Sequence, residues 1–272
     1  MDALETYQMC ISRVKNLNLR ARLSAIEPSV EAAAIDYEAH AIAASLNQIH
    51  TADMVGAVTA DELVTVYDQR MAAKTGPGRP IYDQIKMLPV GDRCPFCDQR
   101  NVSTLDHVLP KSLYPALAVA PDNLVGACME CNKTKSDIEP ASASDVVLHP
   151  YFDNITAVHW LRAEVVQQVP CAVVFWVDAV AAWSPGTLLR VQNHFALFGL
   201  GELYSAEAAR EIAGIRYNLQ EHFDANGPVA VREELVRQRD SRLAYRLNAW
   251  QSALYGALAG SQWFYSGGFA QS

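Results

Sequence analysis

The sequence has no excess of basic residues. It contains 22 Lys and Arg against 30 Asp and Glu, which gives a formal net charge of −8 over 272 residues. This balance argues against general, non-specific adhesion to nucleic acid, which requires a positive field. A polyanion that binds this chain must therefore use local basic positions, helped by divalent cations that offset the repulsion.

Long apolar runs and an export signal are also missing. The most apolar stretch, from Cys171 to Trp183, is interrupted by Asp178 and is too short to span a bilayer. The N-terminus carries Asp2 and Glu5 and lacks a basic leader followed by an apolar run, so we expect no membrane association and a cytoplasmic protein. The length predicts one or two hydrophobic cores.

Cysteine is scarce, but its spacing is informative. Four of the six cysteines form two CxxC pairs, Cys94 with Cys97 and Cys128 with Cys131. Without an export signal, this arrangement favours metal thiolates over disulfides, and a tetrahedral zinc site needs two such turns. The alternatives are a redox CxxC or two unrelated pairs. Because a redox motif would not require a second CxxC, we predict a structural zinc site.

An acid and a histidine lie between the two pairs. Asp106 and His107 belong to a strand-like run from Val102 to Leu109, in which neighbouring side chains are expected to point to opposite sides. The free pKa of a histidine suits a general base, and a carboxylate suits Mg²⁺. Taken alone, a histidine in a strand is more often a structural residue.

Two asparagines extend the pattern. Asn132 follows Cys131, and on a helix their side chains diverge by roughly 100°, so the amide oxygen can face the ion held by the carboxylate. Asn123 precedes Leu124-Val125, which should pair antiparallel with the Asp-His strand. We expect the Asn123 amide to brace the hairpin loop or to hydrogen-bond to His107.

Three lysines are candidate nucleic-acid-binding residues: Lys111, Lys133 and Lys135. The last two lie in the first turns of the predicted helix, where a phosphate would also meet backbone N–H groups. Solvated lysines are the alternative, and it stays open. For a stripe of arginines that includes Arg239 and Arg242, a solvated face paired with acids is the preferred interpretation.

The order CxxC, Asp-His, Asn, CxxC-Asn-x-x-Lys, from Cys94 to Lys135, resembles the HNH endonucleases, in the zinc-binding variant of the ββα-metal type. The matching stretch is roughly one-sixth of the chain. The third letter of the family name is usually histidine, and this chain has Asn132, a common alternative. The amide weakens the affinity for softer metals such as Ni²⁺.

The resemblance implies a role for each residue of the pattern. His107 is the general base, Asp106 and Asn132 bind a catalytic Mg²⁺ or Mn²⁺, and the four cysteines hold structural Zn²⁺. Asn123 positions the hairpin and His107. The implied reaction is hydrolysis of a DNA phosphodiester, in which the ion offsets charge on the phosphate and the leaving 3′ oxygen while the imidazole takes a proton from water.

One such centre nicks one strand, so a double-strand break would need a second copy of the chain or a partner protein, for which an ATPase is a candidate. RNA is not excluded as the substrate. The segment His149-Pro150-Tyr151-Phe152-Asp153 resembles one that follows the nuclease module in some stand-alone bacterial HNH proteins, including ones tied to phage defence. The competing interpretation is a non-catalytic zinc fold that binds nucleic acid or a protein.

The expected fold is α+β and mostly helical. It comprises a helical region at 1–90, a treble-clef-like HNH ββα-metal module at 91–136, and a mainly helical region with a short β-hairpin at 137–272. In the first region, Pro28 should lie in the first turn of a helix whose apolar positions keep to one side: Ile35, Ile42, Leu46 and Ile49. In the last, residues 161–169 and 172–178 are predicted to be strands.

Overall fold

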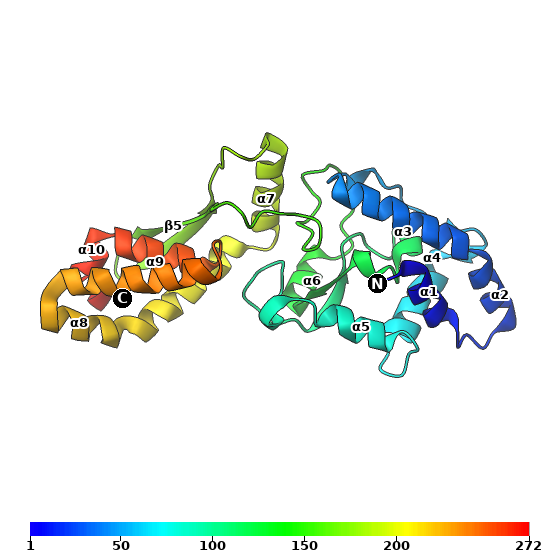
Figure 1. Ribbon diagram of the computed structural model, residues 1–272, viewed down its shortest axis with the longest axis horizontal. Helices are drawn as coiled ribbons and strands as arrows, with labels where there is room; N and C mark the ends of the chain where they lie inside the picture. The colour runs from blue at the N-terminus through cyan, green and yellow to red at the C-terminus, as the bar shows by residue number, and fades with distance from the viewer. Residues whose placement is uncertain (272) are drawn as a thin grey trace. The chain divides into compact units, whose positions relative to one another are not determined.

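The computed structural model describes residues 1–271. Over this range the protein is mostly helical, with three two-stranded antiparallel sheets (Figure 1). Packing divides it into two compact units, Met1–Asp153 and Asn154–Ser272. The sequence segments 1–90 and 91–136 therefore share one unit with the first residues of the third segment. No helix between residues 1 and 271 combines the length and the hydropathy needed to cross a bilayer.

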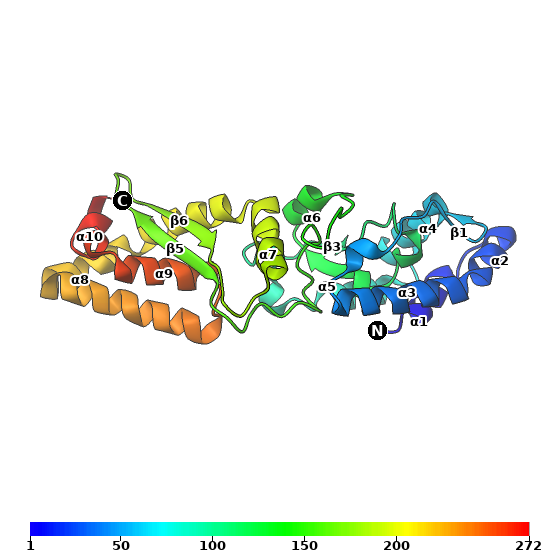
Figure 2. The same cartoon turned by 90° about the horizontal axis from the view of Figure 1, so that it is seen from above.

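The first unit contains the helices α1 (Ala3–Ile11), α2 (Leu17–Ala25), α3 (Glu27–Ile42), α4 (Ala60–Val66), α5 (Arg79–Lys86) and α6 (Met129–Lys135), the strands β1 (Met54–Val55), β2 (Val58–Thr59), β3 (Thr104–His107) and β4 (Leu124–Ala127), and the π-helical turn η2 (Tyr67–Ala72). Side chains of α1 to α5 meet those of β3 and β4 in one buried core. Helices α5 and α6 both contact β3 and lie beside it (Figure 2). The N-terminal helices therefore support the β3–β4 hairpin directly.

Helix α3 begins as predicted but buries a different face. Pro28 lies in its first turn. The predicted apolar side does not face the core along this helix, because Ile35 and Ile42 are 64% and 70% exposed, whereas Val30 and Tyr37 are buried. Leu46 of the predicted side is buried, but it lies beyond the end of α3. Alanines lie on several sides of the helix, so hydrophobicity alone does not define one apolar face. Packing against α1 selects the face that carries Val30 and Tyr37.

The β3–β4 hairpin matches the expected pairing. The strands are antiparallel, with Asp106 opposite Val125 and His107 opposite Leu124. Gly126 of β4 allows close packing, because a Cβ at this position would lie 3.0 Å from Cγ of Pro89. The hairpin is thereby fixed between the end of α5 and the beginning of α6.

The second unit contains β5 (Leu161–Val166), β6 (Ala172–Val177), α7 (Pro185–Leu197), α8 (Leu200–Tyr245), α9 (Trp250–Gly260) and α10 (Gln262–Tyr265). The antiparallel pairing of β5 with β6 confirms the predicted hairpin. Helix α8 is interrupted at Gly227, whose φ of 71° and ψ of −163° suit glycine, and Pro228 follows. The chain reverses direction there (Figure 1). Phe175 of β6 packs on Tyr204 of α8, with ring centroids 5.7 Å apart.

Candidate functional site

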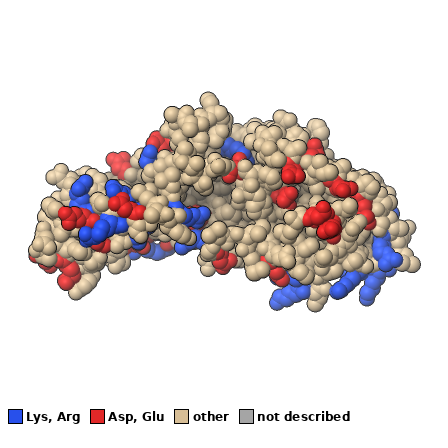
Figure 3. Space-filling view, viewed as in Figure 1, with Lys and Arg blue, Asp and Glu red and all other residues tan. Residues whose placement is uncertain are grey.

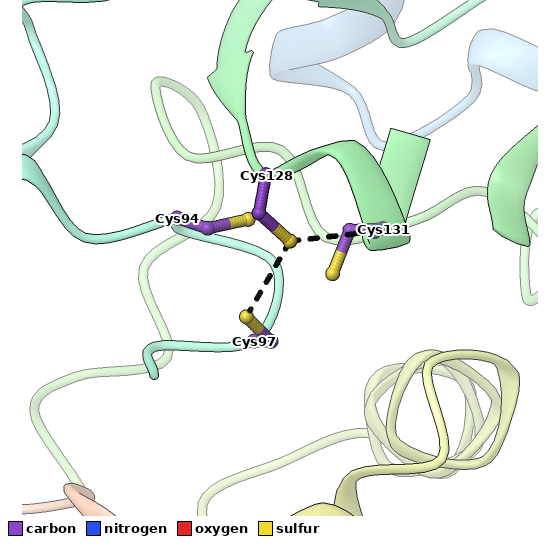
Figure 4. Close-up of side chains that lie close together, drawn as sticks. All are labelled: Cys94, Cys97, Cys128 and Cys131. Carbon is purple, nitrogen blue, oxygen red and sulfur yellow. Dashed lines mark hydrogen bonds between the residues drawn. The ribbon is translucent and has the colours of Figure 1, made fainter. Parts of the chain in front are cut away.

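The cysteines of the two CxxC pairs come together in the first unit. Cys94 and Cys97 lie in the loop before β3, Cys128 is the N-cap of α6, and Cys131 lies in its first turn. Their Sγ atoms are buried, lie within 4.8 Å of one another and face a common point (Figure 4). Thiolates at about 2.3 Å from one tetrahedral zinc ion would be about 3.8 Å apart, and the sulfur atoms of Cys97 and Cys128 are 4.0 Å apart. The group could hold a zinc ion.

Backbone N–H groups already donate to two of these sulfur atoms. The N–H of Arg100 donates to Sγ of Cys97 at 3.5 Å, and the N–H of Cys131 donates to Sγ of Cys128 at 3.3 Å. Hydrogen bonds to sulfur favour thiolate, the form that binds metal. The loop geometry therefore suits a metal ligand set.

A cavity of about 400 Å³ lies in the same unit, lined by residues of η2, α5, β3 and α6 and of the segments that follow β3 and α6. All the predicted site residues outside the cysteine cluster line it, apart from Asn123: Asp106, His107, Lys111, Asn132, Lys133 and Lys135. The acid and the histidine have different neighbours: Asp106 lies beside Lys135 of α6, and His107 packs against Tyr67 of η2.

Asp106 is a buried carboxylate, and one of its two oxygen atoms makes no hydrogen bond to the described residues. It is 5% exposed, and its Oδ1 lies 3.6 Å from Nζ of Lys135. Among the described residues, none makes a hydrogen bond to its Oδ2, which is fully buried. Burial raises the pKa of Asp106 to about 6, although the charge of Lys135 opposes the shift. A buried oxygen without a partner is costly and marks a position where a cation would be stabilised.

His107 is held in one tautomer. Its Nε2 lies 2.8 Å from the carbonyl oxygen of Ala118. Because a carbonyl only accepts, Nε2 carries the proton and Nδ1 is the unprotonated nitrogen of the neutral ring. The ring packs edge-on against Tyr67 of η2, with centroids 4.5 Å apart. His107 is 7% exposed, and this burial lowers its pKa to about 3, so the imidazole is neutral at physiological pH.

The two asparagines have different surroundings. Nδ2 of Asn132 donates to the carbonyl of Leu105 at 3.1 Å, which leaves its Oδ1 as the acceptor of the amide. Asn123 is fully buried and is bound to the backbone of Leu109, accepting its N–H at 2.8 Å and donating to its carbonyl at 2.9 Å. Of the two roles expected for Asn123, these contacts match the loop brace. The ring of His107 is held by a backbone carbonyl instead.

The three lysines differ in exposure. Lys133 is exposed. Lys111 lies 3.2 Å from a carboxylate oxygen of Asp68 and 4.8 Å from the ring centre of Tyr67. Lys135 is only 4% exposed, so the alternative of a solvated lysine was wrong for this residue. Burial lowers the pKa of Lys135, and the neighbouring carboxylates oppose that shift.

The further residues that line the cavity include Tyr67, Tyr82 and Asp137. The tyrosines come from η2 and α5, and the sequence carried no signal that would place them beside His107. Asp137 could have been predicted as a site residue from the sequence, because it is an acid two positions after Lys135. Its Oδ2 accepts a hydrogen bond from the hydroxyl of Ser112 at 2.9 Å.

The segment from His149 to Asp153, at the end of the first unit, packs against α3 and against the region that begins β4. Nε2 of His149 lies 2.9 Å from the hydroxyl of Tyr37 and 3.0 Å from the carbonyl of Asp122. The hydroxyl of Tyr151 donates to the carbonyl of Leu124 in β4 at 2.9 Å. These contacts give the segment a packing role beside the β3–β4 hairpin.

The arginines along α8 are paired with acids, as preferred from the sequence. Arg239 lies 2.8 Å from Asp240, and Arg242 lies 3.7 Å from Glu211. Figure 3 shows basic and acidic side chains interleaved over the visible part of the second unit, without separation into a basic face. This surface gives no support to a phosphate-binding stripe.

Comparisons with known proteins give one informative similarity. No family model and no solved structure matches the chain. The chain is similar to "Protein ea31" of Escherichia phage lambda, with 31% identity over 166 residues, which are 60% of this chain and 56% of that protein. It therefore spans little more than half the length of this relative. The feature that the structure itself assigns is a buried group of four cysteines that could hold zinc.

Proposed function

We propose that this protein is a metal-dependent endonuclease of the HNH type, which hydrolyses DNA phosphodiester bonds. The observation that carries the proposal is the convergence of Asp106, His107 and Asn132 on one cavity, next in sequence to a four-cysteine group. A zinc fold that only binds nucleic acid or protein requires none of these three residues. Their joint placement therefore favours catalysis over binding alone.

The residues around Asp106 fit a hard divalent cation. Its Oδ2 has no hydrogen-bond partner among the described residues, and Oδ1 of Asn132 is the acceptor end of an amide whose Nδ2 donates to the carbonyl of Leu105. Mg²⁺ is often held by one or two protein oxygens together with water and substrate phosphate. When bound, such an ion would offset the negative charge on the phosphate and the leaving oxygen.

His107 is placed to act as the general base. Its Nε2–H is held by Ala118, so the lone pair of Nδ1 is the one that accepts a proton from water. Although burial lowers the pKa of the free His107 ring, a phosphate in the cavity would raise it, because an anion favours the imidazolium form. The carbonyl of Ala118 also stabilises the protonated ring.

The substrate and partners are part of the same proposal. Lys111 and Lys133 supply a local basic spot in an acidic protein, so we expect DNA binding to depend on salt and on divalent ions. Because one centre cuts one strand, we propose that a second copy or a partner protein is needed for a double-strand break. A role against foreign DNA would fit such an enzyme.

Incubation with supercoiled plasmid tests the proposal. The native protein should convert the plasmid to the nicked form with Mg²⁺ or Mn²⁺ and not with EDTA. Asp106→Ala should reduce the rate by about 10²-fold or more, because the cation loses its charged ligand. Intact plasmid under all metal conditions, with zinc present and the fold intact, would support the non-catalytic zinc fold instead.

We also expect nicking to depend on pH through Asp106. At limiting Mn²⁺, the rate should fall as the pH drops through about 6, because burial raises the pKa of Asp106 to that value and the protonated carboxyl does not hold the ion. In the DNA-free protein, burial lowers the pKa of His107 to about 3, so this ring is neutral in that window before the substrate binds. Nicking rates at two Mn²⁺ concentrations provide the check. The midpoint should move to lower pH at the higher concentration, and an unmoved midpoint would assign the titration to another group.

A further inference from the structure

Lys135 occupies an unusual position for a lysine. It is the last residue of α6, its side chain is buried, and its Nζ lies 3.6 Å from Oδ1 of Asp106. The ammonium also donates to the carbonyl of Ser136 at 3.3 Å. Lys133, two residues earlier on the same helix, is exposed. The two lysines therefore have different surroundings, although both line the cavity.

The backbone after Lys135 is shaped to hold this ammonium. Ser136 has a φ of 48° and a ψ of −149°, a region that residues other than glycine rarely adopt. This conformation ends α6 and accompanies the contact between the Ser136 carbonyl and the ammonium. It also leads the chain to Asp137, which lines the same cavity. Strained backbone of this kind persists only where the surrounding structure maintains it.

Asp106 thus already has one cation beside it and one oxygen without a partner. A divalent ion bound at Oδ2 would lie within a few ångströms of the ammonium near Oδ1, in a buried site where like charges repel strongly. Both cations would compete for the same carboxylate. The side chain of a lysine is long and flexible, so its ammonium can move away while the carboxylate stays in place.

We propose that Lys135 is the internal counter-ion of Asp106 in the metal-free centre, and that an entering divalent cation displaces its ammonium toward the substrate phosphate. The second half of this inference rests on the proposed nuclease function, whereas the first half does not. Lys135 is then a positioning residue. It stabilises the buried carboxylate before the metal arrives, and it adds to DNA affinity only afterwards.

Titration of the DNA-free protein with Mn²⁺ at pH 8 tests the first half, with free Mn²⁺ followed by electron paramagnetic resonance. Lys135→Met should bind Mn²⁺ on the order of tenfold more tightly than the native protein, because the competing charge is gone. Lys15→Met, which removes an exposed lysine between α1 and α2, should leave the affinity unchanged. Lys135→Gln serves as a second neutral variant should the methionine variant fold poorly. Equal or weaker Mn²⁺ binding by the folded Lys135 variants would overturn the inference.

DNA affinity measured in EDTA and in Ca²⁺ tests the second half. Lys135→Met should leave the affinity in EDTA unchanged and weaken it severalfold in Ca²⁺, whereas Lys133→Met should weaken it by similar factors in both. An equal loss for Lys135→Met in both conditions would overturn the displacement. Plasmid nicking by the native protein separates the two ideas. If the Mn²⁺ result holds but no plasmid is cut, the nuclease proposal fails and the counter-ion assignment stands.

Discussion

Replacing Cys128 with serine is expected to remove zinc from the protein and to destabilise its first unit severely. Cys128 joins the end of β4 to α6, and its sulfur lies 4.0 Å from that of Cys97. Structural zinc sites in small peptides contribute about 10–16 kcal/mol of apparent binding free energy at neutral pH. Even a fraction of this value is comparable to the whole stability of a domain.

Zinc content by mass spectrometry and thermal unfolding by circular dichroism measure these effects. The native protein should carry about one zinc ion per chain, and Cys128→Ser should carry far less and unfold at a markedly lower temperature. Cys171→Ser, a thiol in the second unit, is the matched control and should retain the zinc. Full zinc occupancy and unchanged unfolding of Cys128→Ser would show that the cysteine group is not a metal site.

Replacing His107 with alanine is expected to lower the rate of plasmid nicking by about 10²–10⁴-fold, the usual contribution of a general base. The physical reason is the fixed tautomer, since Nε2–H is bound to Ala118 and Nδ1 is left to accept the proton of water. No other histidine lines the cavity in the part of the chain that the structure describes. Single-turnover rates at saturating Mn²⁺ are the appropriate measurement.

Two readouts separate the loss of a base from a loss of fold. Zinc content and DNA affinity in Ca²⁺ should be close to the native values for His107→Ala, because the ring contributes neither a thiolate nor a positive charge. His50→Ala removes an exposed histidine outside the cavity and should cut at the native rate. Cutting by His107→Ala at the native rate would exclude this residue from the mechanism.

The parts of the site that were predictable from the sequence are those defined by short spacings. Each CxxC turn brings two sulfur atoms together by local geometry, so the four-cysteine group required only that the two turns meet. The pairing of the Asp106 strand with Leu124-Val125 followed from two strand-like runs joined by a loop. In the second unit, Val-rich and aromatic runs predicted the β5–β6 hairpin for the same reason.

The remainder depended on contacts between distant segments. Tyr67 contacts His107 from a π-helical turn, and no sequence pattern predicted that turn. The burial of Lys135 follows from its ion pair with Asp106 across 29 positions of the chain and from the backbone of Ser136, neither of which has a local signature. The exposed isoleucines of α3 show the same limit, because an alanine-rich helix can bury any of several faces.

The core that the N-terminal helices share with the β3–β4 hairpin also limits how this protein can be re-engineered. Leu105 and Leu124 are buried against side chains of α1 to α5. A fragment limited to residues 91–136 would expose these leucines to water, and we expect it to aggregate rather than to fold as an independent module. Moving the β3–β4 hairpin into another protein would therefore require the whole first unit. A substitution in the N-terminal helices that alters this core would also affect the hairpin.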